Sequence, residues 1–172
     1  MKRNILFILV LISAILSADG LDMKKFKGMK ARSIGPGGMS GRVTAIDVVL
    51  SNTDVIYVGT ASGGLWKSES GGIKWEPIFD DQKAASSGDV TVEPTNPDVS
   101  WVGTGEGNPR NSQSAGFGVY KSIDGGKSWD FKGLGETRNI HRVLINPHNP
   151  DEVYVGAQGA AWGESEHRGV YK

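Results

Sequence analysis

The sequence predicts an all-β fold assembled from repeated antiparallel sheets. Short apolar runs alternate with turn-forming residues along the chain, and one phrase of this pattern occurs three times. After the first 18 residues, no stretch has the sustained apolar spacing that predicts a helix. Glycine accounts for 25 of the 172 residues, which is about twice its usual share and favours many tight turns.

The repeated phrase is a turn followed by a short strand that ends in a small residue. The strands read VIYVGT (55–60), VSWVGT (99–104) and EVYVGA (152–157), and each follows a turn rich in Asn, Asp or Pro. An alternating run precedes each turn, a third run follows each strand, and a fourth follows in the first two units. Four short strands in about 50 residues are typical of a β-propeller blade.

The blade boundaries follow from this repeat. We expect a partial propeller over residues 31–172, with blades at about 42–80, 88–133 and 140–172. The third unit stops at Lys172, where the two earlier units continue with a serine. Because propellers typically close with four to eight blades, the sequence predicts an incomplete N-terminal fragment with fewer than three full blades.

The first residues predict export. In residues 1–18, a positively charged start precedes an apolar run at 5–16 and the small residues Ser17 and Ala18, which is the pattern of a signal peptide. The apolar run is too short to span a bilayer, so no integral membrane segment is expected after cleavage. Residues 19–30 are interpreted as a linker, and the chain has no cysteine for disulfides.

The charge pattern argues against several classes of partner. The chain has 19 basic and 19 acidic residues and no basic cluster, so neither nucleic acid nor an anionic membrane is expected as a partner. His141, His148 and His167 are too scattered to have metal-ligand spacing. The sequence therefore predicts neither a metal site nor a cofactor.

Two glycine-rich boxes recur between the third and fourth runs: SESGGIKW at 68–75 (the first box) and SIDGGKSW at 122–129 (the second box). Serine and aspartate side chains bond backbone N–H groups in turns, glycine supplies positive φ, and tryptophan packs as the chain re-enters a strand. Every residue thus has a structural role, and no nucleophile or base is left over. The structural residues are Ser68, Gly72, Trp75, Ser122, Asp124, Gly126 and Trp129.

The second box matches the S-x-D-x-G-x-x-W pattern in full and resembles the Asp-box, or bacterial neuraminidase repeat, while Ser70 replaces the aspartate in the first box. Together with the P-x-N-P-D-x-V-Y-V-G phrase, this resembles the sortilin-like Asp-box propellers of exported bacterial proteins. The phrases RSIGPGGMSGRVTAIDV, YVGTASGGLWKS and WVGTGEGNPRNS are similar to the start of a bacterial subgroup often called "glycosyl hydrolase". The resemblance covers residues 30–172 and implies a fold more than an activity.

Two enzyme groups share this propeller. Sialidases use an arginine triad and an early Arg-Ile-Pro motif, and the nearest phrase here is Arg32-Ser33-Ile34-Gly35-Pro36. Xyloglucanase-type hydrolases resemble the chain around 60–68, but Ala61 stands where that resemblance implies a catalytic aspartate. No complete catalytic set is present, so the sequence favours a binding function over catalysis.

The candidate ligand site lies in the long loops after the second strands of the second and third units, because loops carry function in propellers. The expected ligand-binding residues are Glu106, Asn108, Arg110, Asn111, Trp162, Glu164, His167 and Arg168. The predicted function is an exported binding or scaffold module that recognises protein, peptide or glycan. A glycoside hydrolase with carboxylates in missing blades is the alternative, and a truncated reading frame without independent function is the third possibility.

Overall fold

The computed structural model describes residues 22, 24, 27–29, 42–108 and 111–172. The chain divides into two units, residues 1–33 and 34–172, and the strands described below belong to the second. The predicted signal peptide lies outside the described residues, as does most of the predicted linker. Among the residues that are described, no helix is long and apolar enough to cross a membrane.

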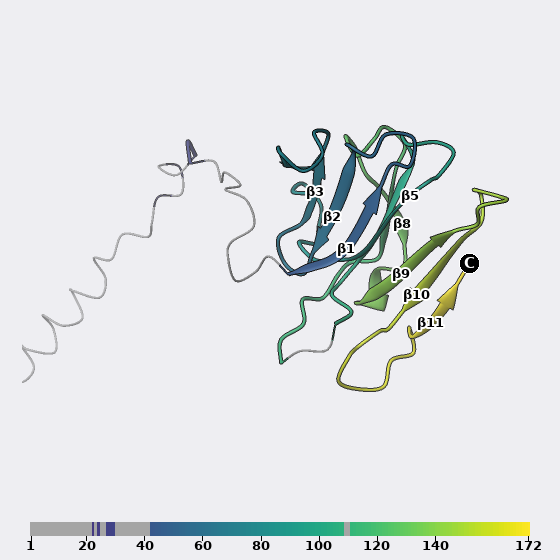
Figure 1. Ribbon diagram of the computed structural model, residues 1–172. Coiled ribbons are helices and arrows are strands. Elements are labelled where there is room, and N and C mark those ends of the chain that lie inside the picture. Colours follow the sequence, from purple (N-terminus) through teal and green to yellow (C-terminus); the bar gives the residue numbers. More distant parts are fainter. Residues whose placement is uncertain (1–21, 23, 25–26, 30–41, 109–110) are drawn as a thin grey trace, which may run out of the picture. The chain divides into compact units, whose positions relative to one another are not determined.

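The second unit contains three antiparallel sheets, which Figure 1 shows side by side. The first sheet consists of β1 (Val43–Val48), β2 (Ile56–Thr60), β3 (Leu65–Ser68) and β4 (Glu76–Pro77). The second consists of β5 (Ser87–Val92), β6 (Ser100–Thr104), β7 (Val119–Ser122) and β8 (Asp130–Gly133). The third consists of β9 (Ile140–Ile145), β10 (Val153–Ala157) and β11 (Gly169–Tyr171). Each strand pairs with the next one in its sheet, and the all-β prediction is confirmed.

The turns between the first and second strands of the three sheets are built alike. In each, an asparagine side-chain oxygen accepts a hydrogen bond from the backbone N–H two residues later. The pairs are Asn52–Asp54, Asn96–Asp98 and Asn149–Asp151, with O···N distances of 3.3, 3.2 and 3.3 Å. The same short phrase therefore makes the same turn three times.

The second box is a turn in which side chains replace backbone partners. Ser122 Oγ accepts the N–H of Gly126 at 2.8 Å and donates to Asp124 Oδ1 at 2.8 Å. Asp124 also accepts the N–H and the hydroxyl of Ser128, at 2.9 and 2.6 Å. These donors hold the pKa of the Asp124 carboxyl at about 2, with the Ser128 hydroxyl contributing most.

The first box keeps this geometry with a serine in the place of the aspartate. Ser68 Oγ accepts the N–H of Gly72 at 2.9 Å, and Ser70 Oγ accepts the N–H of Lys74 at 2.8 Å. In both boxes the first glycine donates its N–H to the turn before the second strand: Gly71 to Asp54 O at 3.0 Å, and Gly125 to Asp98 O at 2.9 Å. The boxes and the Asn turns therefore lie at the same end of the sheets, which we call the box end.

Neighbouring sheets are linked through their first strands. Asp47 Oδ2 on β1 accepts the N–H of Val92 on β5 at 2.7 Å, and Asp89 Oδ2 on β5 accepts the N–H of Val143 on β9 at 2.7 Å. Asp89 is 7% exposed, and this burial raises the pKa of its carboxyl, although the bound N–H groups oppose the shift. The first strands thus lie next to one another, as the blades of a propeller require.

The hydrophobic core lies between the sheets. Phe79, which follows β4, makes edge-to-face contacts with Tyr120 and Trp129 of the second sheet, with ring centroids 5.1 and 5.3 Å apart. These rings belong to a cluster that also includes Tyr57, Leu65, Val90 and Val102 from both sheets. A second cluster joins the second and third sheets and contains Val119, Ile140, Val143, Val155 and Ala157.

A prediction concerns the aspartate of the second box. Its pKa is lowered in the folded state, so its stabilising contribution is full above the unfolded pKa near 4 and is lost as the pH falls toward 2. The Asp124→Ser variant copies the first box and should lose about 0.5–1 kcal/mol at pH 7, the net worth of a hydrogen bond discounted for solvent screening. Urea unfolding between pH 2 and pH 7 should show a weaker acid dependence than in the parent chain.

The matched control is Ser70→Asp, which completes the aspartate pattern in the first box and should strengthen the acid dependence. An unchanged pH profile in Asp124→Ser would contradict the role assigned to this carboxylate.

Candidate functional site

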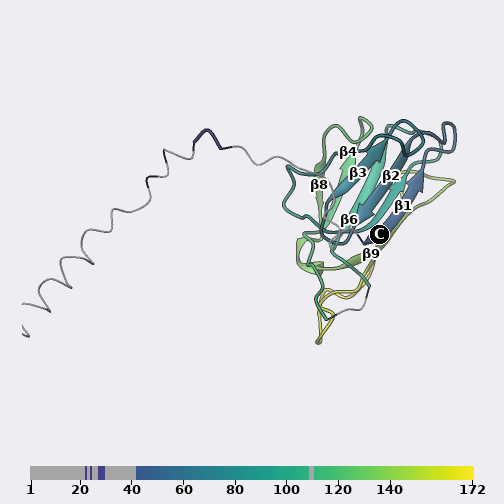
Figure 2. The same ribbon diagram turned by 60° about the vertical axis from the view of Figure 1, so that its left-hand side comes forward.

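The strand directions bring the predicted ligand loops to one end of the sheets, opposite the box end. The links after β2, β6 and β10 cover residues 61–64, 105–118 and 158–168, and the starts of the first strands lie at the same end. Figures 1 and 2 both show the two long loops extending to the same side. We call this the loop end.

A repeated backbone hydrogen bond organises the loop end. In each sheet, the first residue after the second strand donates its backbone N–H to a backbone carbonyl. The acceptor is the residue immediately before the first strand of the same sheet. The pairs are Ala61–Arg42, Gly105–Ser86 and Gln158–Asn139, with N···O distances of 2.9, 2.9 and 2.8 Å. Arg42, Ser86 and Asn139 thus occupy equivalent positions in the three sheets, and we call them the three rim residues.

The loop at 105–118 is held at both ends. Thr104 Oγ1 donates to Gly118 O at 2.7 Å and accepts the N–H of Phe117 at 2.7 Å. Gly105 has a φ of +92°, and a Cβ there would collide with the carbonyl of Arg138, so only glycine fits. The loop therefore projects from a rigid base.

Glu106 is the deepest of the predicted ligand residues. It is 1% exposed, and its Oε1 accepts a hydrogen bond and forms an ion pair with the guanidinium of Arg42, whose side chain is 34% exposed. Its own N–H donates to Ser114 O at 2.9 Å. Glu106 thus joins the second sheet to a rim residue of the first sheet.

The other predicted residues of this loop lie apart from Glu106. Asn108 and Asn111 are exposed, and the Asn108 carbonyl accepts a hydrogen bond from Gln113 Nε2 at 2.9 Å. Arg110 lies outside the described residues. Asn108 and Asn111 are open to a ligand.

In the loop at 158–168, the predicted arginine binds its own chain. Arg168 donates to the carbonyls of Gln158, Ala160 and Gly163 at 2.7, 2.9 and 3.1 Å. The His167 carbonyl accepts the Tyr171 hydroxyl at 2.8 Å. The guanidinium therefore shapes this loop.

The remaining predicted residues of that loop face the solvent. Glu164 and the His167 side chain are exposed, and Trp162 is 74% exposed. An indole face that open is suited to stacking on a ligand ring.

Several buried polar atoms at the loop end have no hydrogen-bond partner within the described part of the chain. They are Arg42 Nε, Ser86 Oγ, Asn139 Oδ1 and Gln158 Oε1. Ser86 and Asn139 are 2% and 4% exposed, so an unmet hydrogen bond there is costly. Sequence reasoning missed the rim residues, although their shared place before each first strand is visible in the repeat.

Ala61 is 2% exposed and lies directly after β2. Its methyl group has no proton to transfer at the position where the xyloglucanase resemblance implies an aspartate. Among the described residues at the loop end, Glu106 is the buried carboxylate, and it is paired with Arg42.

No protein-family model matches the chain, and no curated protein matches it. Among solved structures, it is similar to an ancestral GH74 enzyme, with 25% identity and a TM-score of 0.55 over 72% of this chain and 17% of that one. It is also similar to the GH74 enzyme of Niastella koreensis, with 21% identity and a TM-score of 0.51 over 66% of this chain and 17% of that one. YCF48 of Cyanidioschyzon merolae matches at 18% identity and a TM-score of 0.49, over 71% of this chain and 33% of that one.

The two GH74 enzymes are β-propellers, so the predicted fold class is confirmed. The chain spans less than a fifth of the two GH74 enzymes, at 17% of each. The sortilin-like Asp-box subgroup stays a prediction.

A prediction follows for the buried ion pair. Arg42→Met leaves the Glu106 charge buried without its partner and should lower the free energy of unfolding by about 3 kcal/mol. The double variant Arg42→Met/Glu106→Leu removes both charges and should lose less than the sum of the two single variants. Urea unfolding at pH 7 measures both effects.

The matched control is Lys74→Met. It breaks the exposed Lys74–Glu76 pair, whose side chains are 76% and 65% exposed, and should leave the free energy of unfolding close to that of the parent chain. Equal losses in Arg42→Met and Lys74→Met would contradict the burial argument.

Proposed function

We propose that this chain forms part of an exported β-propeller that binds a glycan at the loop end. The observation that carries the proposal is the group of exposed polar side chains on the two long loops of the loop end, among them Asn108, Asn111 and Glu164. A ligand rich in hydroxyl groups both donates and accepts hydrogen bonds, and therefore suits a mixture of amide and carboxylate groups. Trp162 adds an exposed aromatic face at the same end.

Support for export comes from the charged and apolar start of the sequence, which is typical of a signal peptide. A protein or peptide ligand could use the same polar groups. A glycan is favoured because a sugar ring has both kinds of surface that this site can bind. Its hydroxyl groups can bond the polar side chains, and its apolar face can stack on the exposed indole of Trp162.

The second candidate function is glycoside hydrolysis, and the similarity to GH74 enzymes favours it. Such catalysis requires two carboxyl groups, about 5–9.5 Å apart. Ala61 supplies none, and Glu106 Oε1 is occupied by Arg42. This stretch of chain therefore fits binding better than catalysis.

Binding is tested with the full chain by isothermal titration against xyloglucan oligosaccharides, cello-oligosaccharides and a mixture of unrelated peptides. We expect saturable binding to a glycan, and Trp162→Ala should weaken it about tenfold because it removes the stacking face. The matched control is Ile73→Ala, which removes a side chain that is 90% exposed at the box end and should leave affinity unchanged.

Binding to peptides alone would replace the glycan with a peptide ligand, and no saturable binding would reject the site. Release of reducing ends, lost in Glu106→Gln or Glu164→Gln, would establish the hydrolase in its place.

A further inference from the structure

The link between the second and third sheets departs from a rule that the rest of the described chain follows. At nine described positions a positive φ falls on a glycine, which adopts this conformation at little cost. The two described positions where it falls on another residue are both in this link. Leu134 has a φ of +60°, and Arg138 has a φ of +59° with a ψ of −57°.

Arg138 is the central residue of a tight turn. The N–H of Asn139 donates to the carbonyl of Thr137 at 2.6 Å, so the hydrogen bond closes over three residues. Together with the dihedral angles of Arg138, this bond defines the γ-turn with a positive central φ, which is rare and strained. A glycine would relieve the strain, because it has no Cβ.

The backbone of this turn supports the long loop at 105–118. The carbonyl of Arg138 accepts the N–H of Gly116 at 2.6 Å, and Asn139 Nδ2 donates to Gln113 Oε1 at 3.4 Å. Asn139 is 4% exposed, so the turn is anchored in the interior. None of these contacts uses the side chain of Arg138.

The preceding link shows that the backbone contact does not require a long side chain. Ala85 comes directly before Ser86, as Arg138 comes directly before Asn139, and its carbonyl accepts the N–H of Gly64 at 2.8 Å. Ala85 has no positive φ. The same contact is thus made by a small, unstrained residue in one link and by a strained arginine in the next.

The guanidinium of Arg138 is open to a ligand. The link lies between two described sheets, and within the described part of the chain the exposed Arg138 side chain has no ion pair or hydrogen bond. The exposed side chains of Asn108 and Asn111 belong to the loop that its carbonyl supports. A free guanidinium suits a carboxylate, because its planar fork binds both carboxylate oxygens through parallel hydrogen bonds.

We propose that Arg138 binds the carboxylate of an acidic sugar and makes the loop end selective for acidic glycans, which rests on the glycan binding proposed above and names the class of its ligand. Two N–H groups of the guanidinium donate to the two carboxylate oxygens. The amides of Asn108 and Asn111 bond hydroxyl groups of the sugar. The strained turn fixes the direction in which the arginine side chain leaves the backbone.

Isothermal titration of the full chain with trigalacturonic acid and with cellotriose, a neutral trisaccharide, tests the proposal. We expect trigalacturonic acid to bind at least about tenfold more tightly than cellotriose. Arg138→Met keeps the turn and removes the guanidinium, so it should lower the affinity for trigalacturonic acid at least about tenfold. Arg138→Lys keeps the charge without the planar fork and should retain only part of the preference.

Arg138→Gly separates a binding role from a structural one. It removes the guanidinium and relieves the turn, so it should bind trigalacturonic acid as weakly as Arg138→Met does. It should nevertheless unfold at a higher urea concentration than the parent chain, although glycine also makes the unfolded chain more flexible. A lower urea midpoint in Arg138→Gly would show that the arginine serves the fold, and would overturn the proposal.

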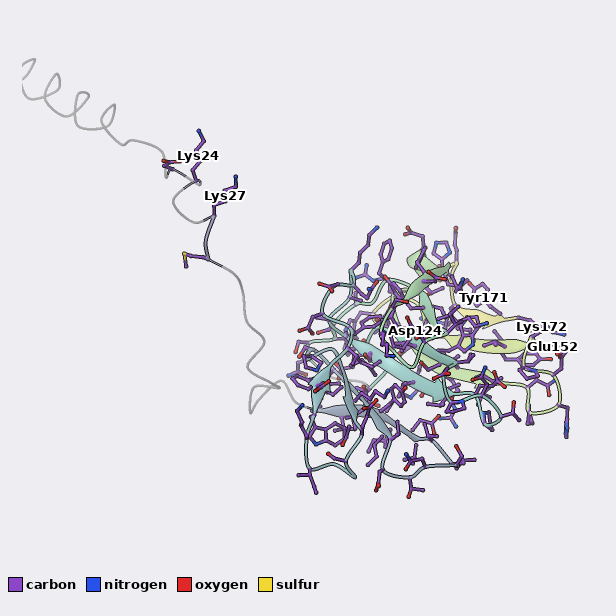
Figure 3. All side chains as sticks on the ribbon, turned by 90° about the horizontal axis from the view of Figure 1, so that it is seen from above. Lys24, Lys27, Asp124, Glu152, Tyr171 and Lys172 are labelled. Carbon is purple, nitrogen blue, oxygen red and sulfur yellow. The ribbon has the colours of Figure 1, made fainter. Side chains whose placement is uncertain are left out.

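The matched control is Lys127→Met, which removes one positive charge from an exposed residue of the second box. Figure 3 shows Asp124, which belongs to the same box, among the side chains of the second unit. Because this box lies at the box end, the substitution should leave the affinity for both trisaccharides and the urea midpoint unchanged. Near-ultraviolet circular dichroism checks that each variant is folded.

The failure of this proposal differs from the failure of the glycan site itself. Equal affinity for the two trisaccharides, or an undiminished preference for trigalacturonic acid in Arg138→Met, would overturn the selectivity and leave a glycan site in place. Binding of xyloglucan oligosaccharides without binding of trigalacturonic acid would do the same. No saturable binding of any of these glycans would reject both the selectivity and the glycan site.

Discussion

The packing of one sheet on the next is the interaction on which the rest of the structure depends. A small meander satisfies its backbone hydrogen bonds internally, but it cannot bury its apolar faces alone. Here the buried aromatic side chains lie between the first and second sheets, where Phe79 contacts Tyr120 and Trp129. The core is therefore a property of adjacent sheets, and no single sheet contains it.

Polar groups fix the geometry that the apolar contacts leave free. Hydrophobic packing has little direction, so two sheets could slide against each other. The carboxylates of Asp47 and Asp89 accept backbone N–H groups of the next sheet, and the Gly125 carbonyl accepts two donors from the preceding one. These bonds act at separate positions along the strands and thereby set the register between sheets. That register brings Arg42 of the first sheet to Glu106 of the second.

The parts of the fold that depend on neighbouring residues could be predicted from the sequence. The three Asn turns and both boxes form from side chains within a few residues of one another, so each short phrase carries its own structure. The sequence also predicts that the first box keeps its turn with Ser70 in place of the aspartate, because the serine hydroxyl still accepts a hydrogen bond from the Lys74 N–H.

The parts that depend on distant residues could not be predicted. Glu106 resembles any exposed carboxylate in a polar loop, and its burial follows from Arg42, which lies 64 residues away. Arg168 stays a predicted ligand residue, and its sequence context does not show that its guanidinium also donates to three carbonyls of its own loop. Trp75 and Trp129 end the same pattern and differ in exposure, because Trp129 packs on the first sheet and donates to Ile78 O, 51 residues before it in the chain.

The two ends of the sheets follow different chemical rules, and this difference bears on function. At the box end, equivalent positions keep equivalent chemistry, since serine and glycine recur and their polar groups are paired locally. At the loop end, the same backbone hydrogen bond holds arginine, serine and asparagine at equivalent positions. Among the described residues, Arg42, Ser86 and Asn139 each also have a buried polar atom without a hydrogen-bond partner, which lowers stability. The constant backbone at the rim thus presents a different functional group from each sheet, as the proposed binding function would require of a repeated scaffold.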